Sequence, residues 1–146
     1  MTTPLGTVTL ERWIAARPET VFSFFTDRER WLSWMGTDGT FSFEPGGDFR
    51  TNITGDNHAA GRFLEFDPPR RVVFTWGWES GGMPIAPGST TVEITLKPDG
   101  DGTLLQLAHR DLPAEAVEPH TEGWTHYMDR LAARAEGADP GADVWQ

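Results

Sequence analysis

The last long segment of the chain, Pro119 to Glu136, has the spacing of an amphipathic helix. An α-helix turns by about 100° per residue, so side chains three or four positions apart share a face. The apolar face centred on Trp124 is made of Val117, His120, Tyr127, Met128, Leu131 and Ala135. We therefore expect one long helix that presents a Trp–Tyr–Met–Leu face to a large apolar surface. His126 points away from that face and is expected to meet solvent.

The N-terminal part predicts one strand and two short helices. Apolar and polar residues alternate from Thr7 to Ile14, which is typical of a strand. Arg12 shares the apolar face, so it is either a paired inward charge or the sign of a register slip near Trp13. A first helix opens around Pro18, where proline is tolerated, and a second runs over 28–35.

From Gly39 onward the pattern changes to short alternating runs separated by turn residues. Strands are expected where apolar residues recur at every second position. The runs are at 41–43, 49–53, 58–66, 72–78, 90–96 and 105–109. The turns between them are rich in Gly, Pro and Asp. The segment Ser80–Ser89 holds three Gly and two Pro and predicts a mobile loop.

The order of these elements predicts an α+β fold. Consecutive strands pair most simply as an antiparallel meander. A curved sheet of about seven strands with one apolar face needs a cover, and only the C-terminal helix is long enough. Such a helix leaves a cavity between itself and the sheet. We expect a single domain over residues 1–146, with a core at about 7–136 and a disordered tail at 137–146.

Composition narrows the classes of partner. The net charge is −10 and the basic residues form no cluster, so we expect no binding to nucleic acid. The chain has no cysteine, which excludes disulfides, thiol nucleophiles and cysteine-based metal sites. No run approaches the roughly 18 apolar residues of a membrane span, and no signal-peptide core is present. We predict a cytoplasmic monomer or homodimer that does not bind membranes.

Five motifs occur in an order that resembles a known family. They are R-P-E-T-V-F at 17–22, W-L-S-W-M at 31–35, P-G-G-D-F-R at 45–50, G-R-F-L-E-F-D-P-P-R-R-V-V-F-T-W at 61–76 and H-x₃-W-x₆-L at 120–131. Together they resemble the domain of the activator-of-heat-shock-protein-ATPase homologues. That domain belongs to the SRPBCC or START-like superfamily, which includes the birch pollen allergen. The resemblance covers roughly residues 7–136.

The resemblance implies a helix-grip fold, in which an antiparallel sheet wraps around the terminal helix and encloses a hydrophobic pocket. It implies no single reaction, because relatives carry lipids, bind plant hormones, cyclise polyketides or sequester reactive antibiotics. The eukaryotic co-chaperone of this family couples the domain to a separate N-terminal domain. A chain of 146 residues leaves no room for one, so we do not expect chaperone activation.

Histidine and tyrosine are the candidate proton-transfer groups. His109 continues the inward face of the last strand and His120 lies at the edge of the Trp124 face, so the two are expected to meet in the pocket. His109 and Tyr127 are the candidate catalytic residues. His120 and His126 diverge on a helix and cannot share one metal ion. We predict neither a metal nor a cofactor.

The aromatic residues are the strongest indication of function. The chain has seven Trp and nine Phe but only one Tyr, more large rings than a small core usually needs. We predict that they line a pocket for a small hydrophobic ligand such as a lipid, a polyketide or a similar natural product. The predicted ligand-binding residues are Trp34, Phe41, Asn52, Phe63, Phe74, Trp76, Trp78, His109, His120, Trp124, Tyr127, Met128 and Leu131.

Other residues are expected at the pocket's edge, and other functions stay open. Arg12 is a further candidate for orienting the ligand, and the loop over 80–89 and the region near Trp34 and Met35 are candidate entrances. One alternative is a cofactor-independent cyclase, hydrolase or dehydratase that acts in the same pocket. Another is a co-chaperone-like module that binds proteins through an acidic surface and needs no cavity.

Overall fold

The sheet and the long helix are arranged as the alternating pattern predicts. The computed structural model describes residues 5–54, 57–79 and 85–145. The expected turn at 55–56 and the first half of the expected loop over 80–89 lie outside the described residues. The described strands form one seven-stranded antiparallel sheet in the order β1-β7-β6-β5-β4-β3-β2.

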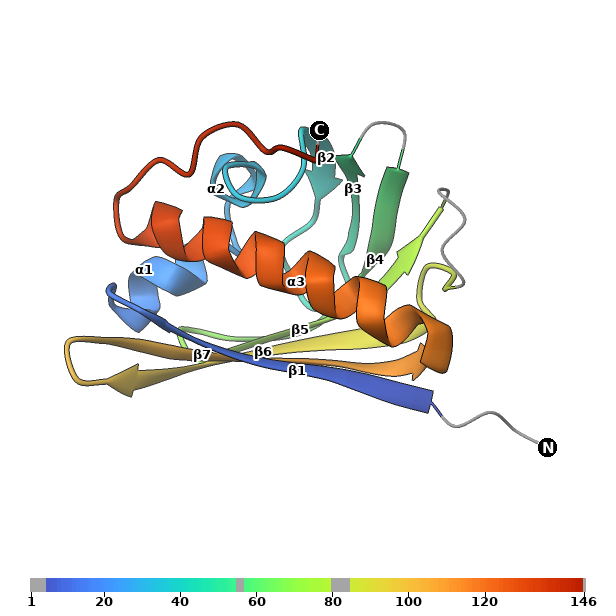
Figure 1. Cartoon of the computed structure of the whole chain (residues 1–146), viewed down its shortest axis with the longest axis horizontal. Helices are drawn as coiled ribbons and strands as arrows, with labels where there is room; N and C mark the ends of the chain where they lie inside the picture. The colour runs from blue at the N-terminus through green and yellow to red at the C-terminus, as the bar shows by residue number, and fades with distance from the viewer. Residues whose placement is uncertain (1–4, 55–56, 80–84, 146) are drawn as a thin grey trace.

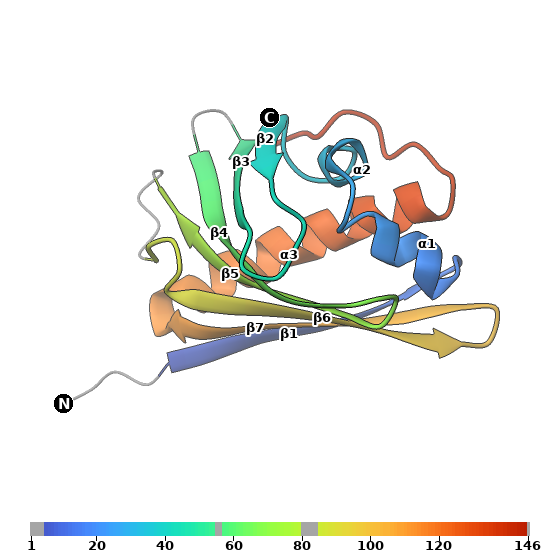
Figure 2. The ribbon, with the colours of Figure 1, turned by 180° about the vertical axis from the view of Figure 1, so that it is seen from behind.

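The elements follow one another along the chain as one strand, two short helices, six strands and one long helix. Their bounds are β1 Leu5–Ile14, α1 Pro18–Ser23, α2 Arg28–Leu32, β2 Asp38–Phe41, β3 Asp48–Thr54, β4 Asn57–Asp67, β5 Arg71–Trp78, β6 Thr90–Asp99, β7 Gly102–Pro113 and α3 Ala114–Ala135. Helix α3 crosses one face of the curved sheet, and α1 and α2 lie near its C-terminal end (Figure 1; Figure 2 from behind). The predicted α+β helix-grip fold is confirmed.

Two helix boundaries differ from the sequence prediction. Helix α3 begins at Ala114, directly after Pro113, rather than at Pro119. Pro119 therefore lies inside the helix, where it removes one intrahelical hydrogen bond. Helix α2 ends at Leu32, and Trp34 and Met35 follow it in turns. Ala114, Glu115, Ala116 and Glu118 are strong helix formers, which explains why α3 starts before the proline.

A solid aromatic cluster, here called the Trp31 cluster, fills the space under α1 and α2. The Trp31 ring is fully buried, and the rings within 6.4 Å of its centroid are Phe25, Trp34, Phe41, Phe43, Phe49, Phe63 and Phe74. Trp34, Phe41, Phe63 and Phe74, predicted to line a pocket, thus pack against one another in the core. Ring packing of this kind is itself a large apolar stabilisation.

Helix α3 is tied to the sheet by a buried chain of hydrogen bonds. Trp124 Nε1–H donates to His109 Nδ1 at 2.9 Å. An indole nitrogen can only donate, so the proton of the imidazole must be on Nε2. His109 Nε2 then faces Thr90 Oγ1 at 2.7 Å, and Thr90 Oγ1 donates to the Trp76 carbonyl at 2.5 Å. The chain connects α3 to β7, β6 and β5, and it requires His109 to be neutral.

Charged side chains lie outside this core. Arg12 pairs with Asp129 on α3 at 3.4 Å, and both side chains are about half exposed. Arg12 is therefore paired, as the first alternative has it, but at the exposed edge of the sheet and not in the interior; the register shift of β1 lies between Gly6 and Val8 instead of near Trp13. On the outer face of the sheet, Glu93 pairs with both Arg71 and Arg110.

Acid is expected to destabilise the fold through His109. Its side chain is fully buried, and burial, followed by the nearby His120, lowers its pKa to about 3. The unfolded chain takes up a proton near pH 6.5 and the folded chain does not, so the free energy of unfolding falls as the pH falls below 6.5. The loss amounts to about 2 kcal/mol at pH 5. Urea unfolding at pH 7.5 and pH 5 measures this loss in the original protein and in His109→Gln. If the free energy of unfolding fell by the same amount in both proteins, the prediction would be wrong.

Trp31 and Trp34 offer a matched pair for testing one buried hydrogen bond. Trp34 Nε1–H donates to the Phe24 carbonyl at 3.2 Å, whereas Trp31 Nε1 has no partner within the described residues. Both indoles are buried, and replacement by phenylalanine removes the same ring volume from each. We expect Trp34→Phe to lower the free energy of unfolding by about 1 kcal/mol more than Trp31→Phe. Equal losses in urea unfolding, or a larger loss for Trp31→Phe, would refute this.

Candidate functional site: an aromatic cavity under helix α3

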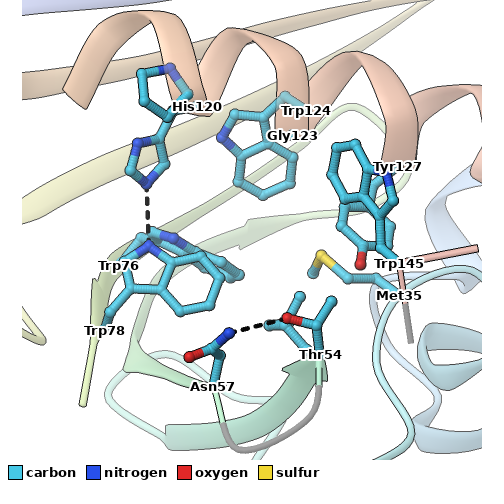
Figure 3. Close-up of a pocket in the computed structure, with 12 residues that line it drawn as sticks. Met35, Thr54, Asn57, Trp76, Trp78, His120, Gly123, Trp124, Tyr127 and Trp145 are labelled. Atoms are coloured by element: carbon cyan, nitrogen blue, oxygen red, sulfur yellow. Dashed lines mark hydrogen bonds between the residues drawn. The ribbon is translucent and has the colours of Figure 1, made fainter. Parts of the chain in front are cut away.

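A cavity of about 160 Å³ lies between α3 and the β3–β5 part of the sheet (Figure 3). It is mostly aromatic and has no charged side chain among its lining residues. These residues are Met35, Ile53, Thr54, Asn57, Trp76, Trp78, Pro119, His120, Gly123, Trp124, Tyr127 and Trp145. The space adjoins the Trp31 cluster along β5, because Phe74 belongs to the cluster and Trp76, on the same face of the strand, contacts both.

The predicted ligand-binding residues fall into three groups. Trp76, Trp78, His120, Trp124 and Tyr127 line the cavity. Trp34, Phe41, Phe63, Phe74, His109, Met128 and Leu131 belong to the packed interior behind it, while Asn52 lines a separate shallow depression beside β2. Arg12, on the surface beside Asp129, is not part of the wall. Alternation and helical spacing therefore identify inward-facing residues but do not separate cavity wall from solid core.

His120 is held in the cavity wall as a neutral hydrogen-bonded group. Its Nδ1 lies 2.8 Å from the Ala116 carbonyl, and its Nε2 accepts from Trp78 Nε1–H at 3.0 Å. The indole can only donate, so the imidazole proton is on Nδ1 and points at Ala116. Burial lowers the pKa of His120, and the bond to Ala116 opposes that shift only in part. Both ring nitrogens are engaged.

His109 and His120 do meet, but only His120 reaches the cavity. Their ring centroids are 5.2 Å apart in an edge-on arrangement, with His109 on the far side. His109 is fully buried, and its two nitrogens are occupied by Trp124 and Thr90. A ligand in the cavity would have to displace Trp124 before it could touch His109.

The C-terminal tail, residues 137–145, folds back against α3, and its Trp145 lines the cavity. Asp143 accepts hydrogen bonds from Tyr127 Oη–H and from His126 Nε2, both at 2.8 Å. Trp145 stacks on the His126 ring with centroids 3.9 Å apart. His126 is therefore covered by the tail, contrary to the expectation that it meets solvent. The tail crosses above α3 and ends beside β2 (Figures 1 and 2).

Tyr127 and Asp143 form a polarised pair beside the cavity. Burial, and after it the hydrogen bond to Asp143, raises the pKa of Tyr127 above its usual value, so the phenol stays neutral. Burial alone would raise the pKa of Asp143, but hydrogen bonds from the Trp145 backbone, His126 and Tyr127 outweigh it and lower that pKa. The carboxylate is thus charged, and only 6% of its side chain is exposed.

Gly123 is the lining residue that the pattern of apolar positions could not reveal. It lies inside α3 between His120 and Trp124, and a Cβ placed on it would meet no atom within 4 Å apart from its chain neighbours and the backbone of its own helix. Met35 lines the cavity from beyond α2, where an entrance was expected. On the opposite side, Asn57 Nδ2 donates to Thr54 Oγ1 at 3.1 Å and joins the ends of β3 and β4.

Two further properties concern the described residues alone. Across residues 5–54, 57–79 and 85–145, no three His, Asp or Glu side chains are grouped closely enough to hold a metal ion. None of the helices in the same ranges is long and apolar enough to cross a membrane.

Comparison with known proteins gives a family and several structural relatives. The family model described as Activator of Hsp90 ATPase homolog 1-like protein matches residues 15–136. The solution structure of an AHSA1-like protein from Rhizobium etli is 43% identical, with 98% of this chain and 89% of that chain covered and a TM-score of 0.77. CalU16 from Micromonospora echinospora is 27% identical, with 96% and 86% covered and a TM-score of 0.75. No curated protein matches the chain.

A more distant relative shares the fold alone. The Aha1 dimer from Colwellia psychrerythraea is 15% identical, with 90% of this chain and 96% of that chain covered and a TM-score of 0.76. The family match spans the two short helices, β2 to β7 and all of α3, which are the elements that build the cavity. This chain belongs to the Activator of Hsp90 ATPase homolog 1-like family.

Proposed function

We propose that the protein binds a small aromatic or otherwise apolar molecule in the cavity under α3. The observation that carries this proposal is Gly123. Glycine inside a helix destabilises it by about 1 kcal/mol relative to alanine. No neighbouring atom excludes a side chain at this position, so packing does not require glycine there. Gly123 lines the cavity, and what the glycine preserves there is open space.

The size of the cavity limits what the ligand can be. Its volume of about 160 Å³ is close to that of an engineered cavity of about 150 Å³ that takes up benzene. One aromatic ring with small substituents therefore fits. Trp145, which forms part of the wall, is 45% exposed, so the cavity reaches the protein surface there. A lipid or polyketide would place one ring or chain end inside and extend outward past Trp145.

The geometry supports binding more strongly than acid–base catalysis. A cyclase, hydrolase or dehydratase of the kind considered above needs a proton donor or acceptor that is free to meet the substrate. His120 has both nitrogens engaged, and the hydroxyl of Tyr127 donates its hydrogen bond to Asp143. His109 lies behind Trp124. These groups hold the wall in one arrangement, which favours recognition of a ligand by shape.

Filling the space at Gly123 is expected to abolish binding. Gly123→Leu places a side chain in the cavity, whereas Gly123→Ala leaves most of the space and raises the free energy of unfolding by about 1 kcal/mol. The probes are toluene, 4-methylphenol and indole, titrated against the indole N–H signals in nitrogen–proton NMR spectra. The signals of Trp76, Trp78, Trp124 and Trp145 should shift in the original protein and in Gly123→Ala but not in Gly123→Leu.

The remote signals of Trp13 and Trp31 are the internal control for this titration. Trp13 lies on the surface and Trp31 in the solid core, so neither should respond. Equal binding by the Leu variant would place the ligand elsewhere on the protein. If a wider screen of small aromatic compounds and lipids, by thermal shift and native mass spectrometry, produced no binder at all, the proposed function would be wrong.

A further inference from the structure

The cavity is walled by aromatic rings that meet at wide angles. The Trp76 and Trp78 rings are 5.7 Å apart at 90°, and those of Trp76 and Trp124 are 5.2 Å apart at 54°. On the other side, the Tyr127 and Trp145 rings are 5.8 Å apart at 89°. Figure 3 shows these side chains around the same space, which Met35 also lines. Rings in this arrangement form a box around a guest rather than a slot for one flat ring.

We propose that the ligand of this cavity is a small organic cation, a quaternary or alkylated ammonium group held by the rings of Trp76, Trp78, Trp124, Tyr127 and Trp145. This inference rests on the proposed function, because it names the chemical class of the molecule that the cavity binds. The face of an aromatic ring carries partial negative charge and attracts a cation within about 6 Å of its centre, most strongly for tryptophan.

The direction of the N–H groups of Trp78 and Trp124 favours this class. The N–H is the positive edge of the ring, and in Trp78 and Trp124 it is already donated to His120 and His109. Those donors point into the protein and are unavailable to an anion or to a carbonyl oxygen of a ligand. The parts of these two rings left to the guest are electron-rich. The Nε1–H of Trp76 is buried without a partner within the described residues, so it remains a donor for a guest that also carries an acceptor atom, such as the hydroxyl oxygen of choline.

The charges around the cavity also favour a cationic ligand. No Lys or Arg is among the lining residues, and both nitrogens of His120 are engaged as those of a neutral ring. The Tyr127 hydroxyl donates to the buried carboxylate of Asp143, which adds electron density to the phenol ring. Arg130 is the opposing charge, but its guanidinium donates to the Trp34 and Gly141 carbonyls and does not line the space. The net charge of −10 also favours a cation over an anion.

A pair of probes with the same shape and different charge tests the inference. Choline and 3,3-dimethylbutan-1-ol differ in a quaternary nitrogen against a quaternary carbon, and tetramethylammonium is the smallest cationic probe. Each is titrated into the full chain while the indole N–H signals are followed, with sodium chloride as the control for unspecific ionic effects. We expect choline to bind at least about tenfold more tightly than the alcohol, as a desolvated cation–ring contact would give. Sodium chloride should leave the cavity signals unchanged.

Two exposed tryptophans supply a matched pair of variants. Trp145 is 45% exposed and lines the cavity, while Trp13 is 47% exposed and lies on β1, away from the cavity. Trp145→Leu keeps an apolar side chain but removes a ring face, so it should weaken choline binding severalfold and leave the alcohol nearly unchanged. Trp13→Leu should change neither. Asp143→Asn, which removes the charge behind Tyr127, should also weaken choline selectively.

The outcomes separate this inference from the proposed function. Equal affinity for choline and the alcohol, or an equal loss of both in Trp145→Leu, would overturn the cation and leave a cavity for neutral ligands. Binding of toluene or indole without any binding of the cations would do the same. If neither the cations nor the neutral compounds shift the cavity signals, the proposed function itself fails.

Discussion

The hydrogen bond from the buried indole of Trp124 to the imidazole of His109 is the constraint on which the rest of the structure depends. A donor buried in an apolar interior is costly to leave unpaired. The indole can only donate, so His109 must be neutral and must carry its proton on the other nitrogen. That proton faces Thr90, which donates in turn to the Trp76 carbonyl. One requirement thus fixes the position of α3 over three strands.

The same rule repeats along the cavity and shapes what the site can do. Trp78 donates to His120, and Tyr127 donates to Asp143 in the tail. These two donors are matched inside the protein, whereas the buried Nε1–H of Trp76 has no partner within the described residues, so the wall presents mainly ring faces and few polar atoms to a guest. A site built in this way selects by size, shape and the weak field of the rings. It has little with which to move a proton.

Much of the fold could be predicted from the sequence, but less of the site could be. The face of α3 and the alternation of β5 were readable because burial imposes a period on the chain. Phe63 and Trp76 look alike in such a pattern, although one fills the core and the other lines a cavity. Trp145 and Asp143 lie in a tail without any period, and their role depends on meeting His126 and Tyr127. Gly123 gave no signal because its contribution is an absent side chain.

The adjacency of the Trp31 cluster and the cavity on strand β5 has a consequence for how such a protein diversifies. Phe74 belongs to the cluster that holds the sheet and the short helices together, whereas Trp78 and Gly123 border open space. Substitutions at those two positions, or at Trp145 in the tail, alter the size and polarity of the cavity wall without changing a residue of the Trp31 cluster. Such a division allows one fold to acquire new ligands through substitutions at a few positions, while the packing that stabilises the fold is unchanged.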